Sequence, residues 1–143
     1  MVVDEKLKLL SLTEKVKLIS GESMWRTFPI ERAGIPVLKV SDGPNGVRGD
    51  GGRAAACFPV GICMASTWNT ALIEQVGADI ADEARSKDVQ VVLGPTINIH
   101  RTPLAGRNFE CYSEDPYLSG LLASAFTIGL QNKGVGACLK HFV

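Results

Sequence analysis

The sequence predicts an α/β fold in which parallel strands alternate with amphipathic helices, built either as an open doubly wound sheet or as part of a (β/α)8 barrel. Two observations predict it. Short apolar runs bounded by turn formers alternate with longer segments that carry one apolar stripe, as in strand–helix–strand units. Polar side chains also follow the apolar runs, and in both architectures the working face lies at the C-terminal ends of the strands.

A helix is expected from residue 11, before any strand. Residues 11–14, Ser-Leu-Thr-Glu, form a capping box in which each polar side chain bonds the other residue's backbone amide. Gly21 is a suitable C-terminal stop. The apolar positions of this helix share one face: Leu12, Val16 and Ile19. We expect the helix to plug or flank the fold that follows.

The first two strands are expected at residues 34–42 and 61–65. The first is an extended apolar run that ends at Asp42, because Gly, Pro and Asn follow directly as turn formers. A glycine-rich loop at 49–53 comes next. After the second strand, a helix begins at Asn69 or Thr70 as cap. Its apolar stripe comprises Leu72, Ile73, Val76, Ile80 and Ala84, and its outward side Glu74, Asp79, Asp82, Glu83 and Lys87.

A third strand at residues 90–93, another helix and a fourth strand complete the alternation. Asp115 as N-cap and Pro116 at the first helical position are a strong start signal. The helix carries one apolar face, formed by Leu118, Leu121, Leu122 and Ala125, and ends at Gly134. The fourth strand is expected at residues 135–143, and the sequence stops inside or just beyond it.

The stretch from Leu93 to Pro116 is expected to be an ordered, working loop. It connects the third strand to the last helix through about twenty residues without helical or strand period, and loops of that length are usually either functional or disordered. It carries too much apolar surface for a solvated linker: Ile97, Ile99, Leu104, Phe109 and Tyr112. Disorder is therefore not the expected explanation of its length.

Four polar residues mark the expected strand ends. Asp42 ends the first strand, Arg107 lies in the loop after the third, and Lys140 with His141 ends the fourth. Because parallel strands present their C-terminal ends at one rim, these side chains should converge. A carboxylate can accept from two adjacent hydroxyls while arginine and lysine donate to others. The set therefore suits a polyhydroxylated ligand.

Each of these residues also has a purely structural interpretation. Asp42 could open the Gly-Pro-Asn-Gly turn through its side chain. Arg107 could be an exposed or salt-bridged loop residue. Lys140 and His141 favour function more strongly, because they interrupt an otherwise apolar strand.

Structural roles are expected for the other conspicuous side chains. His100 should hydrogen-bond within its loop, Glu110 should pair with a nearby arginine, and Asp115 is explained as a helix cap. Aromatic rings can stack on sugars, but core packing is their default role. That default applies here to Trp25, Trp68 and Phe109.

Composition and motifs argue against several classes of function. Fifteen basic and fifteen acidic residues cancel, so nothing attracts the chain generally to nucleic acid or to an anionic membrane. No run approaches the roughly twenty apolar residues of a membrane span, and charges stand where a signal peptide would have its apolar core, which favours a cytoplasmic protein. Phosphate-binding glycine motifs and a Gly-x-Ser-x-Gly elbow are absent. The cysteines lack zinc-site spacing and are expected to be reduced, mostly buried thiols: Cys57, Cys63, Cys111 and Cys138.

Four segments together resemble a known family. They are residues 40–49 (Val-Ser-Asp-Gly-Pro-Asn-Gly-Val-Arg-Gly), 93–98 (Leu-Gly-Pro-Thr-Ile-Asn), 101–116 (Arg-Thr-Pro-Leu-Ala-Gly-Arg-Asn-Phe-Glu-Cys-Tyr-Ser-Glu-Asp-Pro) and 140–142 (Lys-His-Phe). In this order and spacing they resemble the N-terminal part of a β-glucosidase of glycoside hydrolase family 3. Four linked motifs are far more specific than any one of them, and the likeness covers essentially the whole chain.

The resemblance implies a (β/α)8 barrel, followed in the family by an α/β sandwich domain and often a fibronectin-like domain. It implies hydrolysis of terminal, non-reducing β-D-glucosyl residues from a carbohydrate substrate, with retained configuration and without a cofactor. Asp42 matches the family aspartate that holds sugar hydroxyls. Arg107 matches the arginine of a Gly-Arg-x-x-Glu segment, and Lys140 and His141 match a Lys-His pair, all of them substrate binders.

The family's catalytic carboxylates are not found in these 143 residues. A retaining glycosidase needs a nucleophile and an acid/base roughly 5 to 5.5 Å apart, and the family places its nucleophile in a later Ser-Asp-Trp-like motif. A complete barrel also needs roughly 250 residues. Residues 1–143 are therefore interpreted as a fragment, the N-terminal half of a barrel with strands one to about four. Alone it should not hydrolyse glycosides.

Two other functions stay open on the residues themselves. Lys140 could be the nucleophile of a Schiff-base lyase, assisted by His141. The chain could instead be a non-catalytic sugar-binding or structural half-barrel.

Overall fold

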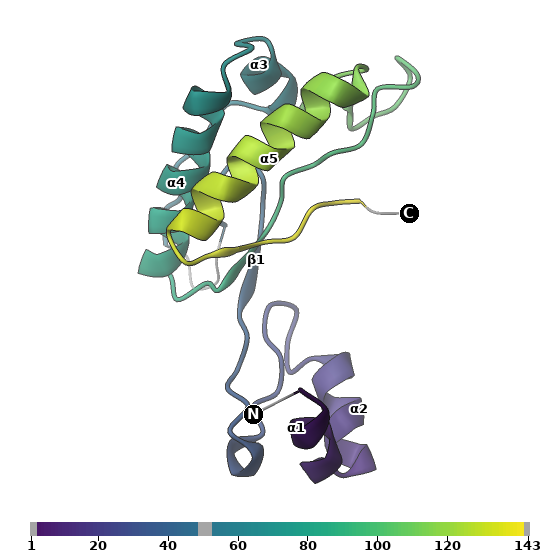
Figure 1. Cartoon of the computed structure of the whole chain (residues 1–143), viewed down its shortest axis with the longest axis vertical. Coiled ribbons are helices and arrows are strands. Elements are labelled where there is room, and N and C mark those ends of the chain that lie inside the picture. The colour runs from purple at the N-terminus through teal and green to yellow at the C-terminus, as the bar shows by residue number, and fades with distance from the viewer. Residues whose placement is uncertain (1–2, 49–52, 142–143) are drawn as a thin grey trace. The chain divides into compact units, whose positions relative to one another are not determined.

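The computed structural model describes residues 3–48 and 53–141 (Figure 1). The chain divides into two compact units, Met1–Val40 and Ser41–Val143. Most of the expected glycine-rich loop at 49–53, and the last two residues of the expected fourth strand, lie outside the described residues.

The first unit contains the helices α1 (Val3–Leu9) and α2 (Leu12–Ser20) and the short 3-10 helix η1 (Glu31–Ala33). Helix α1 is too short and too charged to reveal itself by an apolar stripe, and it was not predicted. The small core of this unit consists of Leu10, Ile30 and Ala33, with Leu18 and Ile35 packed against them. The apolar face predicted for α2 contributes nothing to that core, because its three residues are exposed.

The capping box predicted at the start of α2 is confirmed. The Glu14 amide donates to Ser11 Oγ at 3.3 Å, and the Ser11 amide donates to Glu14 Oε2 at 2.8 Å. Gly21 caps the other end of α2, as expected, with a positive φ of 74°.

Three short strands form one sheet in the order β1 (Val40–Asp42), β2 (Val91–Leu93) and β3 (Gly136–Ala137). Strands β2 and β3 are parallel, with Val91 paired to Gly136. Helices connect successive strands, so the α/β class with parallel strands is confirmed.

The first strand is much shorter than predicted. Residues 34–39 do not join the sheet, because part of this backbone bonds to the chain that precedes it. The Thr27 amide donates to Leu38 O at 3.0 Å, and the Ile30 amide donates to Ile35 O at 2.9 Å. An extended apolar run alone does not reveal which neighbour it pairs with.

The strand predicted at residues 61–65 is a helix, α3 (Gly61–Ala65), so that prediction is wrong. Its buried positions are Gly61, Met64 and Ala65, at the i, i+3, i+4 spacing of a helical face, while Ile62 and Cys63 between them are exposed. A five-residue apolar run fits either period, and the burial of one face of a helix decides the outcome here.

The two long helices, α4 (Thr70–Ser86) and α5 (Pro116–Asn132), lie side by side in Figure 1 and pack closely. Their predicted caps are confirmed, since Asn69 Oδ1 accepts from the Leu72 amide and Asp115 accepts from the first amides of α5. None of the described helices is long and apolar enough to span a membrane. The main core includes Ile73, Ile80, Val92, Leu122, Phe126 and Leu130, all fully buried.

Other predictions about burial are also wrong, including those for Leu72 and Leu121, which were placed on apolar helix faces but are exposed. Glu83 and Lys87, placed on the outward side of α4, lie largely buried, with 16% and 5% of their side chains exposed. All four cysteines are free thiols, but Cys111 is the one that is buried. Two aromatic rings that were expected in the core, those of Trp68 and Phe109, are 74% and 54% exposed. Local periodicity fixes neither the partners of a charged side chain nor the side on which a loop residue projects.

Candidate functional site

The carboxylate of Asp42 is engaged by two cations at the C-terminal end of β1. Lys140 Nζ donates to its Oδ1 at 2.7 Å, and Arg48 Nε lies 3.7 Å from its Oδ2. The Arg48 amide also donates to the backbone oxygen of Asp42 at 2.8 Å. Asp42 therefore has a role beyond opening the turn, because its side chain joins two other parts of the chain.

Lys140 reaches Asp42 because parallel pairing continues beyond β3. Its amide donates to Pro95 O at 3.0 Å, and its carbonyl accepts from the Ile97 amide at 2.8 Å. An isolated parallel bridge accordingly joins Thr96 and Lys140. This extension carries the expected strand-end lysine to the rim, although β3 itself ends at Ala137.

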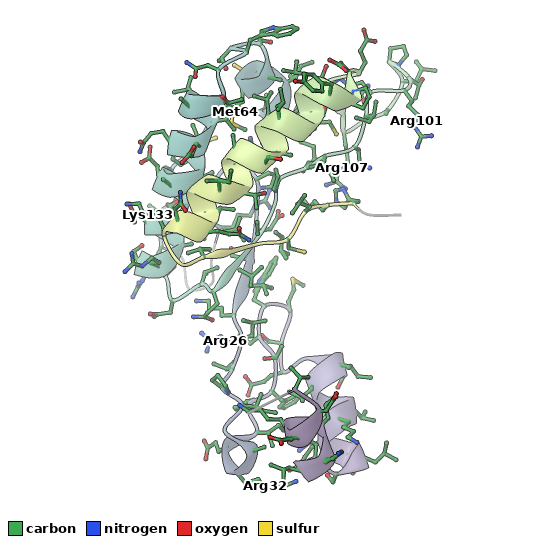
Figure 2. All side chains as sticks on the ribbon, in the orientation of Figure 1. Arg26, Arg32, Met64, Arg101, Arg107 and Lys133 are labelled. Carbon is green, nitrogen blue, oxygen red and sulfur yellow. The ribbon has the colours of Figure 1, made fainter. Side chains whose placement is uncertain are left out.

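Arg107 is held by Glu110 in the long loop, where the short 3-10 helix η2 (Asn108–Glu110) begins just after it. Its Nε donates to Glu110 Oε1, and Thr96 Oγ1 donates to Glu110 Oε2 at 3.0 Å. The prediction that Glu110 pairs with a nearby arginine is confirmed. Figure 2 shows Arg107 on this loop, whereas Arg101 lies at the loop's outer tip.

Electrostatics keep both partners of this pair charged. Burial, the largest single influence, raises the pKa of Glu110, but hydrogen bonds from Arg107 and Thr96 outweigh it, so the pKa lies below its ordinary value. The hydrogen bond with Glu110 raises the pKa of Arg107, and the charge of Asp42 adds to that effect. Asp42 and Arg107 therefore lie close enough to influence each other.

His141 is oriented by Asn98. The His141 amide donates to Asn98 Oδ1 at 3.0 Å, and ring atom Nδ1 lies 3.2 Å from the same oxygen. The peptide bonds that follow Asp42 and Lys140 are both cis.

The four predicted residues converge, but they line two pockets. Arg107 and His141 line a pocket of about 340 Å³, together with Thr96, Asn98 and Glu110. Asp42 lines a second pocket of about 250 Å³ with Arg48. Lys140 joins the two groups, since it bonds Asp42 directly and its charge lowers the pKa of Glu110.

This arrangement suits recognition of hydroxyl groups. It combines carboxylate acceptors with guanidinium, ammonium and imidazole groups on one rim. Across residues 3–48 and 53–141 there is no cluster of His, Cys, Asp and Glu that could hold a metal ion. A Schiff-base nucleophile must be an unprotonated amine, whereas Lys140 forms an ion pair with Asp42.

Sequence reasoning missed three residues of the site. Arg48 lies beyond the predicted turn, Thr96 reads as an ordinary loop residue, and Asn98 was noted as part of a motif without a role. Arg48 carried a usable signal, because it is the first cation after a strand-end aspartate. His100 was assigned correctly as a loop hydrogen-bonder, since its Nε2 lies 2.8 Å from Asn108 O.

Comparisons with known proteins find relatives that match nearly the whole chain. The model of the glycosyl hydrolase family 3 N terminal domain matches residues 8–143. A curated β-glucosidase of Rhizobium radiobacter is 50% identical over 146 residues, which cover 99% of this chain and 18% of that protein. The chain thus spans less than a fifth of the length of this relative.

Solved structures show the same likeness. The β-glucosidase of Kluyveromyces marxianus in complex with glucose superposes with a TM-score of 0.95 at 46% identity, over 99% of this chain and 18% of that one. The β-glucosidase 3B of Thermotoga neapolitana in complex with α-D-glucose gives a TM-score of 0.88 at 45% identity, over 99% of this chain and 23% of that one.

Proposed function

Because this chain belongs to glycosyl hydrolase family 3, whose N-terminal domain model matches residues 8–143, we propose that it supplies the sugar-binding part of a β-glucosidase. The protein removes terminal, non-reducing β-D-glucosyl residues from β-glucosides or oligosaccharides and retains the configuration of the sugar. The observation that carries this proposal is the Asp42 carboxylate, held by Lys140 beside Arg107 and His141. Relatives named β-glucosidase, some of them solved with glucose, support it.

Asp42 is proposed as the main acceptor for sugar hydroxyls. An ionised carboxylate has about four lone-pair sites, so ion pairs with Lys140 and Arg48 leave room for hydroxyl donors. Lys140 fixes the orientation of the carboxylate before the sugar arrives, which reduces the conformational entropy lost on binding. A single sugar hydroxyl can donate to the Asp42 carboxylate and accept from the Lys140 ammonium group.

Arg107 and His141 are proposed as donors on the other side of the sugar. Glu110 engages Nε of Arg107 and so fixes the plane of the guanidinium, whose terminal N–H groups can then meet hydroxyl oxygens. Asn98 orients the His141 ring in the same way. Both side chains line the larger pocket, whose volume of about 340 Å³ lies within the usual range for a small-molecule site.

Neither carboxylate of the site is proposed as a catalytic group. A retaining glycosidase uses one carboxylate as nucleophile and one carboxylic acid as proton donor. Asp42 and Glu110 are each bonded to a cation, which suits binding and orientation. We therefore assign substrate binding, and no catalytic role, to Asp42, Arg107, Lys140 and His141.

The test is the substitution Asp42→Asn in the full-length protein, assayed with p-nitrophenyl β-D-glucopyranoside. Asparagine keeps the shape but removes the charge and one acceptor oxygen. Hydroxyl contacts of this kind strengthen in the transition state, and a loss of about 3 kcal/mol lowers kcat/KM by roughly 100-fold. Asp79→Asn, at an exposed position of α4, is the matched control and should keep wild-type kinetics. Wild-type kinetics for Asp42→Asn would remove Asp42 from the site.

A further inference from the structure

The last turn of α4 and its C-cap residue carry a buried ion pair that the proposed function has not used. Lys87 Nζ donates to Glu83 Oε1 at 3.0 Å, and the two side chains are 5% and 16% exposed. Removing two charges from water is costly, and a buried pair is weak evidence of a contribution to stability. The position of this pair therefore needs another explanation.

Other bonds of the pair reach the backbone of Val47 and of Ala56. Lys87 Nζ donates to Val47 O at 2.6 Å, and the Val47 amide donates to Glu83 Oε2 at 3.3 Å. The Ala56 amide donates to Glu83 Oε1 at 2.9 Å. The amides of Val47 and Ala56, nine positions apart in the sequence, thus both donate to Glu83.

A further bond and a close contact hold the same region. Arg53 Nη1 donates to Ser86 O at 2.8 Å, also at the end of α4. A Cβ added to Gly46 would lie 2.1 Å from Ala56 O, so the backbones of Gly46 and Ala56 approach as closely as a glycine allows. Their positions are therefore coupled.

Described residues on both sides of positions 49–52 line the Asp42 pocket. Arg48 follows Val47 directly and approaches the Asp42 carboxylate, and Arg48 and Ala56 line the same pocket of about 250 Å³ as Asp42. A shift of the Val47 backbone would carry Arg48 away from the carboxylate. Glu83 and Lys87 therefore act on the contact between Arg48 and Asp42 through the Val47 backbone.

We infer that Glu83 and Lys87 are positioning residues, which hold Arg48 against Asp42 and so set the affinity of the site for the sugar and its transition state. This inference rests on the proposed function. The charge state supports it. Burial, the largest influence, raises the pKa of Glu83, but bonds from the Ala56 and Val47 amides and from Lys87 outweigh it, so the pKa lies below its ordinary value. Glu83 is thus ionised at neutral pH and accepts all three bonds.

A double-mutant cycle between Glu83→Gln and Arg48→Ala tests the inference. In the full-length protein, Glu83→Gln should lower kcat/KM for p-nitrophenyl β-D-glucopyranoside by about 10- to 100-fold, because a misplacement of about 1 Å costs up to that much. In the Arg48→Ala background the same substitution should change kcat/KM by less than about twofold, because the residue through which it acts is gone. The control is Asp82→Asn, on the same helix as Glu83. It removes an exposed ion pair with Lys133 and should leave kcat/KM unchanged.

The outcomes separate the two proposals. A full loss from Glu83→Gln in both backgrounds would mean a general structural role and would overturn the inference, as would no loss in either. If Asp42→Asn has wild-type kinetics, or if the protein lacks β-glucosidase activity, the proposed function fails and the inference with it. Should Glu83→Gln fail to fold, as judged by its melting curve, Lys87→Gln enters the same cycle with the same expectations.

Discussion

At the scale of single residues, local rules predict the partners that lie within one helical turn. Glu110 was expected to pair with a nearby arginine and does so with Arg107, three residues away. Glu14 was expected to complete a capping box with Ser11 and does so. Its second partner, Arg32, was not predicted, because eighteen residues separate the two and no local spacing rule joins them.

The pKa of Glu14 gives a direct test of that long-range contact. Hydrogen bonds from Arg32, and next from the Ser11 amide, lower the pKa of Glu14 from 4.5 to about 2. We expect its carboxyl carbon to titrate near pH 2 in an NMR experiment, and Arg32→Gln to move the midpoint well up toward 4.5. Lys8→Gln, which removes another cation of the same unit, should leave it in place. A midpoint near 4.5 in the unmodified protein would contradict the contact.

The sign of the linked effect on stability follows from this lowered value. A carboxylate whose folded-state pKa is depressed stabilises the fold above its unfolded pKa. For Glu14 the contribution is complete above about pH 4.5 and is lost as the pH falls toward 2. Arg32→Gln should therefore flatten the dependence of the melting temperature on pH in that window.

At the scale of elements, helices with polar caps were predicted well, whereas short apolar runs were not. Asn69 and Asp115 fix the starts of α4 and α5 through side-chain oxygens that any sequence reader can recognise. The run at residues 61–65 has no such signal, and it became a helix because residues 61, 64 and 65 face the core. Strand lengths were overestimated for a related reason. Backbone pairing depends on which other segment lies beside the strand, and the local sequence does not show that segment.

The packing of α4 on α5 depends on two glycines and gives a prediction about stability. A Cβ on Gly129 would lie 2.1 Å from Glu74 O, and one on Gly77 would lie 2.4 Å from Phe126 O. Gly129→Ala should therefore force the helices apart and destabilise the protein by about 2 kcal/mol or more, within the range typical of overpacking. The change is measured by urea unfolding.

Gly120→Ala, in the same helix, is the matched control. Nothing lies within 4 Å of a Cβ built there, and alanine is preferred over glycine inside a helix. It should stabilise the protein by about 0.5–1 kcal/mol. Equal effects of the two substitutions would contradict the close packing of α4 and α5.

At the scale of the whole molecule, the grouping of the site residues was predictable, because parallel strands place the residues at their C-terminal ends along one edge of the sheet. That rule grouped Asp42, Arg107, Lys140 and His141 before any contact was known. In the structure Lys140 bonds Asp42, and Arg107 and His141 line one pocket. The family resemblance predicted the N-terminal part of a (β/α)8 barrel, and the solved relatives confirm this fold.

The support behind the site was not predictable from the sequence. Glu83 and Lys87 looked like ordinary outward charges of an amphipathic helix. Their partners are backbone groups between 27 and 40 residues away in the sequence. Almost every residue type carries a backbone N–H and C=O group. No pattern of side chains could therefore reveal which backbone groups Glu83 and Lys87 bond.

A crystal structure of the full-length protein with glucose is the measurement that tests the central claim most directly. The account predicts glucose on the rim formed by β1, the long loop and the extension of β3. Two hydroxyls should lie within hydrogen-bonding distance of the Asp42 carboxylate, and Arg107, Lys140 and His141 should donate to the same sugar. Glucose bound elsewhere, with no hydroxyl near Asp42, would contradict it.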